Sequence, residues 1–101
     1  MLVIVSFTYT SDLVYIPDSS KYTPKKLQIL FDKWLYNKSI DHEYWIYRDG
    51  RKYGVSFDIH AFIKWLNENI FADSDDKAKI KVRITKKNAS QIPKGLEELY
   101  F

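Results

Sequence analysis

Two histidines, His42 and His60, are the residues whose side chains could exchange a proton near neutral pH. Neither has a second histidine at the spacing of a metal-binding pair, so a histidine site would need carboxylates from distant parts of the chain. His60 follows Asp58 at the expected start of a helix, where the helix dipole opposes its protonation. Because the sequence also lacks a convincing nucleophile, a glycine-rich phosphate loop and a carboxylate pair, we expect a non-enzymatic protein with no metal and no cofactor.

Cysteine is absent from the chain, which excludes disulfide scaffolds, thiolate zinc sites and cysteine nucleophiles. The acidic stretch Asp73–Asp76 is a candidate for calcium ligands. A calcium loop needs a longer alternation of oxygen ligands and a closing glutamate, which this stretch lacks. We therefore expect 73–76 to be a solvated loop.

Basic residues give a better indication of a binding function. The chain has 16 Lys and Arg against 13 Asp and Glu, a net charge of +3 and a pI near 9.0, which mildly favours an anionic partner. Three of the cations, Lys79, Lys81 and Arg83, alternate with the apolar residues of the segment Ala78–Ile84. This period of two predicts a strand with one apolar face and one cationic face.

A second basic segment also carries aromatic side chains. Asp49 and Gly50 form the dipeptide that supplies positive φ in a type I′ hairpin turn, and β-rich runs flank it between Glu43 and Phe57. The register expected from this turn pairs Arg48 with Arg51, Tyr47 with Lys52, Ile46 with Tyr53, Trp45 with Gly54 and Tyr44 with Val55.

This register separates the hairpin into two faces. The residues expected to face the core are Tyr44, Ile46, Tyr53, Val55 and Phe57, and those expected on the other face are Trp45, Tyr47, Lys52, Gly54 and Ser56.

Two further strands and a terminal element have to position these surfaces. Leu2–Thr10 alternates like a half-buried strand, and Leu13–Ile16 can pair with it as an extra strand before Pro17 ends the run. Leu96–Phe101 is too apolar for a free tail, so we expect it to pack back as an edge strand or a short helix.

Two amphipathic helices are expected as well. Thr23 is a typical N-cap before Pro24, and Asp58 is well placed to cap the second helix. Apolar side chains at helical spacing are Leu27, Leu30, Phe31, Trp34 and Leu35 on the first helix and Ile59, Phe62, Ile63, Leu66 and Ile70 on the second. Aromatic residues at this spacing are nearly always core, so Phe31 and Trp34 are assigned to the core, with Trp65 at the margin of the second stripe.

The order of these elements predicts one α+β domain over residues 1–101, with a ferredoxin-like βαββαβ topology. Both helices would lie on one face of a four-stranded, largely antiparallel sheet. Pairing of 13–16 with the first strand would add a member to the sheet and change the strand order. The apolar opening Leu2–Phe7 is too short for a secretion signal or a membrane span, so we expect a cytoplasmic protein.

In that topology the open face of the sheet carries an aromatic ridge and a basic ridge. The expected partner-binding residues are Trp45, Tyr47, Lys52, Lys79, Lys81 and Arg83. A single strand of nucleic acid could stack its bases on the aromatic rings while its phosphates meet the cations. In the alternative hypothesis these residues bind no partner: the edge lysines prevent aggregation, and Trp45 packs against Gly54 across the strands.

A protein-binding regulator or inhibitor of the phage or mobile-element type is the rival hypothesis. Such a protein would act through a sheet edge or an exposed aromatic patch. The strands expected at 43–48 and 78–85 are the edges that could augment the sheet of a protein partner.

Overall fold

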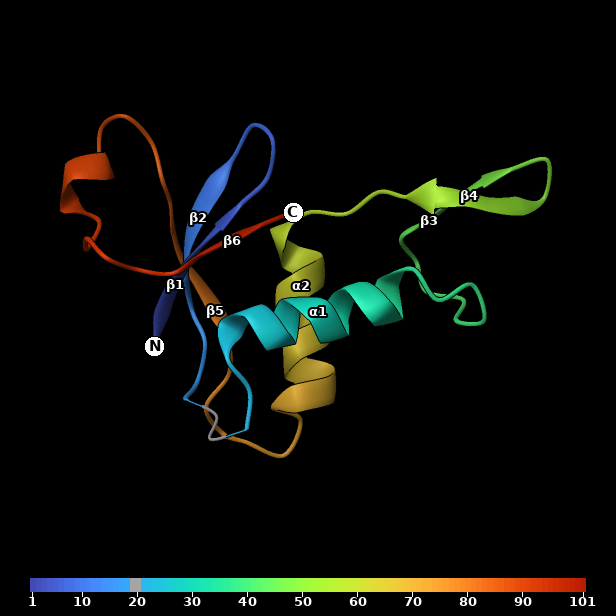
Figure 1. Cartoon of the computed structure of the whole chain (residues 1–101), viewed down its shortest axis with the longest axis horizontal. Helices are drawn as coiled ribbons and strands as arrows, with labels where there is room; N and C mark the ends of the chain where they lie inside the picture. Colours follow the sequence, from blue (N-terminus) through green and yellow to red (C-terminus); the bar gives the residue numbers. More distant parts are fainter. Residues whose placement is uncertain (19–20) are drawn as a thin grey trace.

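The computed structural model describes residues 1–18 and 21–101, which form an α+β fold (Figure 1). A mixed four-stranded sheet packs against two helices, and a separate two-stranded hairpin lies at the other end of the longest axis. The strands of the sheet are β1 (Leu2–Ser6), β2 (Ser11–Tyr15), β5 (Lys79–Arg83) and β6 (Glu98–Tyr100). The hairpin consists of β3 (Trp45–Arg48) and β4 (Arg51–Val55).

Both helices begin at the predicted caps. The side chain of Thr23 accepts a hydrogen bond from the backbone N–H of Lys26 at 3.2 Å, and α1 (Pro24–Leu35) follows. Asp58 accepts one from the N–H of His60 at 2.9 Å ahead of α2 (Ile59–Trp65). This helix continues as the π-helical turn η1 (Leu66–Ile70). Within the described ranges, no helix combines the length and the apolar character that crossing a bilayer demands.

The core lies between the helices and one face of the sheet. Phe31 of α1 is fully buried at its centre and makes ring contacts with centroid separations between 5.3 and 5.9 Å. Its ring partners come from both helices, from the segment after β4 and from the end of the chain: Trp34, Phe57, Phe62, Trp65 and Phe101. Burial of each large apolar side chain stabilises the fold by about 1.5–3 kcal/mol.

The sheet differs from the predicted ferredoxin-like topology, because its strand order is β5-β2-β1-β6. The segment predicted as one strand, Leu2–Thr10, ends at Ser6 and turns, with the N–H of Phe7 bonded to the carbonyl of Thr10 at 2.8 Å. The extra strand forms as β2, from Ser11 to Tyr15, and pairs antiparallel with β1. This local pairing occupies one side of β1, and the hairpin is left outside the sheet.

The last strand completes the other side of β1. β6 pairs parallel with β1, so that Leu99 lies opposite Val5 and is buried with it. The prediction that the C-terminal segment packs back is therefore confirmed in its edge-strand form. In Figure 1 the connection 84–97 between β5 and β6 lies on the side of the sheet away from α1 and α2.

The hairpin turn is confirmed, and the register beyond it is corrected. Asp49 and Gly50 have φ of 53° and 73°, as a type I′ turn requires. Arg48 pairs with Arg51 and Tyr47 with Lys52 as predicted, but Ile46 then pairs with Gly54 and Trp45 with Val55. Tyr53 is the extra residue of a β-bulge, so Ile46 and Trp45 each pair with a residue one further along β4 than predicted, and their faces are exchanged.

The exchange reverses the predicted burial of the hairpin. Trp45 is 8% exposed, whereas Ile46 is 43% and Tyr53 63% exposed. Tyr44 and Val55 do remain partly buried against the core, as predicted.

A second bulge changes the faces of β5. Val82 pairs with Leu13 and Ile80 with Val14, so Lys81 is the extra residue between them. Ile80 packs on the core beside Val14, whereas Val82 lies opposite Leu13 on the face away from the helices and is 39% exposed. The predicted division into one apolar and one cationic face is therefore wrong for this strand.

Candidate nucleic-acid interface

The six residues predicted to bind a partner fall into two separate groups. Trp45, Tyr47 and Lys52 belong to the β3–β4 hairpin, whereas Lys79, Lys81 and Arg83 belong to β5 at the edge of the four-stranded sheet. The structure brings the members of each group together, but the two groups do not share a sheet face. A single ligand path across an open sheet therefore has no structural basis.

Trp45 and Lys52 hold the base of the hairpin to the preceding loop. The indole Nε1 of Trp45 donates to the carbonyl of Ile40 at 2.6 Å, and its ring stacks on His42 at 4.9 Å between centroids. The ammonium of Lys52 also donates to the carbonyl of Ile40, at 3.3 Å, and forms an ion pair with Asp41. These contacts leave Trp45 little surface for stacking on a base.

The cations of β5 are also partly engaged within the chain. Arg83 donates from Nε to the carboxylate of Asp12 at 2.8 Å. The ammonium of Lys79 lies 5.5 Å from the ring centre of Tyr15. Lys81, in the bulge, is exposed. This set is therefore less positive than the sequence pattern indicated.

The two histidines have local roles. His42 accepts a hydrogen bond at Nδ1 from the N–H of Tyr44 at 3.1 Å, and its Nε2 lies 2.7 Å from the carbonyl of Leu35. A neutral ring with its proton on Nε2 satisfies both contacts. His60 is exposed beside its cap, Asp58. In the described part of the chain, no three His, Asp or Glu side chains are grouped as ligands of a metal ion.

The tip of the hairpin forms a basic exposed surface. Tyr47 is 56% exposed, and the guanidinium of Arg48 lies 4.1 Å from the ring centre of Tyr53. A shallow depression of about 590 Å³ lies here, and its lining residues are Lys38, Arg48, Asp49, Arg51, Lys52 and Tyr53. Four cations and one carboxylate line this depression, and one of the cations, Lys52, is paired with Asp41. The remaining positive charge favours an anion.

Sequence reasoning missed most of this surface. It selected Tyr47 and Lys52 but left out Lys38, Arg48, Arg51 and Tyr53. Tyr53 was assigned to the core, and the pair Arg48–Arg51 was predicted but not taken as a binding site. The signal for the arginines was present in the register predicted from the turn. A type I′ turn places its two flanking residues opposite each other, here Arg48 and Arg51.

Comparison of the chain with models of protein families, with curated protein sequences and with solved structures found no match.

Proposed function

We propose that the chain is a non-enzymatic nucleic-acid-binding domain and that the β3–β4 hairpin is its contact element. The observation that carries this proposal is the combination of exposed cations and exposed tyrosines on a hairpin that extends away from the helices and the sheet (Figure 1). Arginine forks bind phosphate oxygens in pairs of hydrogen bonds. Exposed tyrosine rings offer faces on which unpaired bases stack.

The proposed contacts differ from those expected from the sequence. Tyr47 and Tyr53 replace Trp45 as stacking rings, because the indole of Trp45 is buried. Arg48 and Arg51 replace the cations of β5 as the main phosphate ligands, since Arg83 is paired with Asp12. A single strand is the favoured ligand because its bases are free to stack.

Binding of a labelled single-stranded oligonucleotide at several salt concentrations tests the proposal. We expect Kd to rise steeply with salt, because cations on the protein displace counterions from the strand. The double variant Arg48→Ala/Arg51→Ala should weaken binding at low salt about tenfold or more. It should also reduce the slope of log Kd against log salt by about 1.4, the value for two lost phosphate contacts.

The matched control is Lys86→Ala/Lys87→Ala, which removes the same charge from two exposed residues of the connection 84–97. It should keep most of the affinity and of the salt slope. Absence of binding at low salt, or equal losses in both double variants, would contradict a site at the hairpin.

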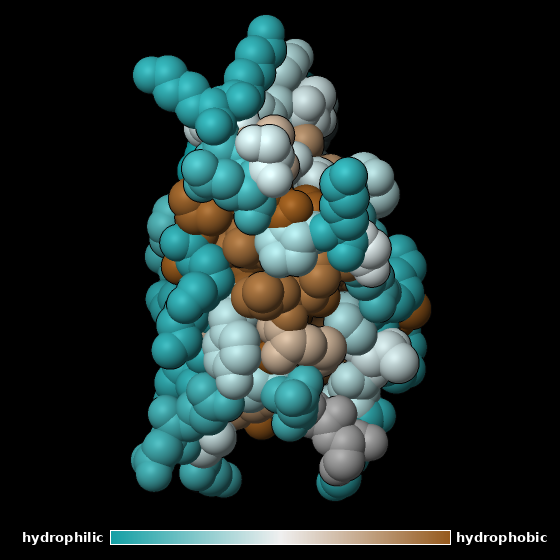
Figure 2. Space-filling view, turned by 90° about the vertical axis from the view of Figure 1, so that its left-hand side faces the viewer, coloured by the Kyte–Doolittle hydropathy of each residue, from teal (hydrophilic) through white to brown (hydrophobic). Residues whose placement is uncertain are grey.

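A protein-binding regulator is the second candidate, and the face of the sheet away from the helices favours it. Figure 2 shows a hydrophobic area between hydrophilic rims on this side of the molecule. Val82 is 39% exposed on this face, and Ile4 is half-buried two strands away, with Leu13 paired between them. β5 and β6 are the end strands of the sheet, so either edge could pair with a strand of a partner.

Affinity capture from a nuclease-treated lysate separates the two candidates. A protein retained in a fixed ratio by the wild type, lost with Val82→Asp and kept by Arg48→Ala/Arg51→Ala would support the regulator. Loss of every partner after nuclease treatment would support the nucleic-acid proposal.

A further inference from the structure

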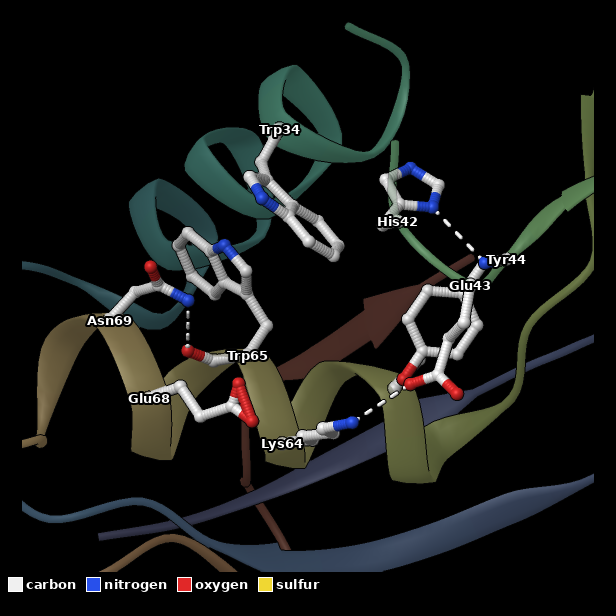
Figure 3. A pocket seen from close by; sticks show the side chains of 9 residues that line it. Trp34, His42, Glu43, Tyr44, Lys64, Trp65, Glu68 and Asn69 are labelled. Atoms are coloured by element: carbon white, nitrogen blue, oxygen red, sulfur yellow. Dashed lines mark hydrogen bonds and ion pairs between the residues drawn. The ribbon is translucent and has the colours of Figure 1, made fainter. Parts of the chain in front are cut away.

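A pocket of about 250 Å³ lies at the base of the hairpin, between the two helices and the loop that leads into β3 (Figure 3). Its lining residues are Trp34, His42, Glu43, Tyr44, Ala61, Lys64, Trp65, Glu68 and Asn69. The volume is just below the roughly 300–1,000 Å³ of sites for drug-sized ligands. The pocket therefore suits a single head group.

Three aromatic rings from three segments form its walls. Trp34 of α1 lies 6.5 Å from Trp65 of α2 and 6.3 Å from Tyr44 of the loop, measured between ring centroids. The planes of Trp34 and Tyr44 meet at 69°, and in Figure 3 the three rings surround a common space. Faces of aromatic rings carry negative electrostatic potential and attract cations.

The packing around the rings fixes this arrangement before any ligand binds. Trp65 is 6% exposed and lies against Phe31 at 5.6 Å between centroids. The backbone carbonyl of Tyr44 accepts a hydrogen bond from Ser56 at 2.9 Å, and its N–H is bonded to His42. A rigid site loses less conformational entropy on binding.

The charges at the rim of the pocket also favour a cation. Glu43 and Glu68 supply two carboxylates, and Lys64 supplies one ammonium, which is bound to Glu43 at 2.8 Å. Hydrogen bonds from Lys64 and Tyr44 lower the pKa of Glu43, so this carboxylate is ionised at neutral pH. Glu68 takes part in none of the ion pairs found among residues 1–18 and 21–101.

No cation of the described chain occupies the ring faces of the pocket. The cation–ring contacts found among the described residues join Arg48 to Tyr53, Lys52 to Trp45 and Lys79 to Tyr15. The ammonium of Lys64 is held at the rim by Glu43 instead. The imidazole of His42 covers part of Trp34, at 4.5 Å between ring centroids, and the ring surface that still lines the pocket is open to a cation from outside.

We propose that this pocket binds an alkylated ammonium group, in which methyl groups replace the N–H donors. A primary ammonium or a guanidinium needs several hydrogen-bond acceptors, and the pocket has one carboxylate that is not already paired, that of Glu68. An alkylated ammonium needs few acceptors, and it gains from apolar contact with the rings and from their potential. The site is separate from the hairpin tip, so it does not rest on the nucleic-acid proposal.

Titration with choline tests the charge requirement. The matched probe is its neutral isostere, in which a tert-butyl group replaces the trimethylammonium group. Tryptophan fluorescence and the indole N–H resonances of Trp34 and Trp65 report occupancy. We expect choline to bind about tenfold or more tighter than the isostere, because the two have the same shape and differ in charge. Equal binding, or no change with either probe up to high millimolar concentration, would overturn the proposal.

A peptide with one trimethyllysine identifies the source of the group. Tighter binding of this peptide than of choline assigns the pocket to a modified protein, and the reverse order assigns it to a small molecule. Both results uphold the alkylated ammonium. Tighter binding of the unmethylated peptide than of the methylated one would overturn it.

Variants locate the binding in this pocket. Trp34→Leu removes an aromatic face and should weaken choline binding about tenfold, whereas Trp34→Phe keeps a ring and should weaken it less. Glu68→Gln keeps the shape of an exposed side chain and should weaken binding severalfold. The control Glu97→Gln removes an exposed carboxylate from the connection 84–97 and should change nothing. Circular dichroism verifies the fold of each variant, and unchanged affinity in folded Trp34→Leu and Glu68→Gln would overturn the assignment.

Discussion

An indole ring ties the hairpin to the loop that precedes it. Trp45 donates to the carbonyl of Ile40 at 2.6 Å, stacks on His42 with an interplanar angle of 6°, and lies 5.4 Å from the ammonium of Lys52. Ile46, its neighbour in the strand, faces solvent. The bulge at Tyr53 gives the buried position to the aromatic residue and the exposed one to the aliphatic residue.

We expect Trp45→Ala to lower the free energy of unfolding by about 3 kcal/mol, because it empties a buried site and removes the closer of the two donors to the carbonyl of Ile40. Ile46→Ala should cost less than about 1 kcal/mol, because its side chain is 43% exposed. Chemical denaturation of both variants measures these changes. A larger loss of stability in Ile46→Ala than in Trp45→Ala would support the register expected from the turn alone.

Asp12 is a carboxylate buried in the sheet, 2% exposed, with one oxygen bonded to Arg83 and the other, Oδ2, without a hydrogen-bond partner among the described residues. Arg83→Ala would leave a buried charge unpaired and should lower the free energy of unfolding by about 1–3 kcal/mol. Asp12→Val/Arg83→Ala should recover most of this loss, because it removes both charges. A double-mutant cycle by denaturant unfolding tests the coupling, and additive losses would show that the pair is not coupled.

At the scale of the elements, ion pairs join the loop before β3 to its surroundings. Glu43 pairs with Lys64 of α2, and Asp41 with Lys52 of β4. A hydrogen bond from Lys64 is the first cause that lowers the pKa of Glu43 from its ordinary 4.5, and the same bond raises the pKa of Lys64 from 10.5. Because its pKa is lower in the folded state, the Glu43 carboxyl stabilises the fold above pH 4.5. This effect is lost as the pH falls through the folded pKa of Glu43. Because its pKa is higher in the folded state, the Lys64 ammonium stabilises the fold below pH 10.5. This effect is lost as the pH rises through the folded pKa of Lys64.

We expect an NMR titration to place the midpoint of the Glu43 carboxyl below 4.5 and to find it higher in Lys64→Met. The reason is that the ammonium stabilises the ionised carboxylate through a hydrogen bond and its charge. The control is Lys94→Met, which removes an exposed ammonium from the connection 84–97 and should leave the Glu43 midpoint unchanged. An unchanged midpoint for Glu43 in Lys64→Met would mean that the pair does not persist in solution.

The sequence predicted those elements whose signals are local. Thr23 before Pro24 and Asp58 before Ile59 located both helix starts, and Asp49-Gly50 located the turn. A pattern of period two cannot reveal a bulge, because the extra residue is recognised only from the partner strand. The bulges at Tyr53 and Lys81 therefore reversed the expected faces of Trp45 and Val82.

Long-range pairing was beyond the reach of these signals. β6 lies parallel to β1 from the opposite end of the chain, and no local pattern specifies such a partner. The aromatic pocket could not be predicted for the same reason, since Trp34 and Trp65 lie on different helices and Tyr44 on a loop. Each ring alone is typical of core, and their common space depends on how the helices pack.

At the scale of the whole molecule, the chain combines a well-packed body with an extended arm. Its extents are 46 × 33 × 19 Å, and the hairpin occupies one end of the longest axis (Figure 1). β1 and β2 are the inner strands of the sheet and contribute side chains to the core, whereas β3 and β4 pair only with each other among the described strands. Isolated two-stranded hairpins are marginally stable in water, so the arm relies on the contacts at its base.

We therefore expect amide hydrogen exchange to distinguish the two parts. Amides of β1 and β2 should exchange only through global unfolding, at a free energy in the range of about 5–15 kcal/mol. Amides of β3 and β4 should open locally at a much lower free energy and remain insensitive to low denaturant, because local opening exposes little surface. A saturating single-stranded oligonucleotide should slow exchange in the hairpin and leave β1 unchanged, since a ligand protects the segment that it orders. Exchange as slow in the hairpin as in β1 would show that the arm and the body unfold as one unit.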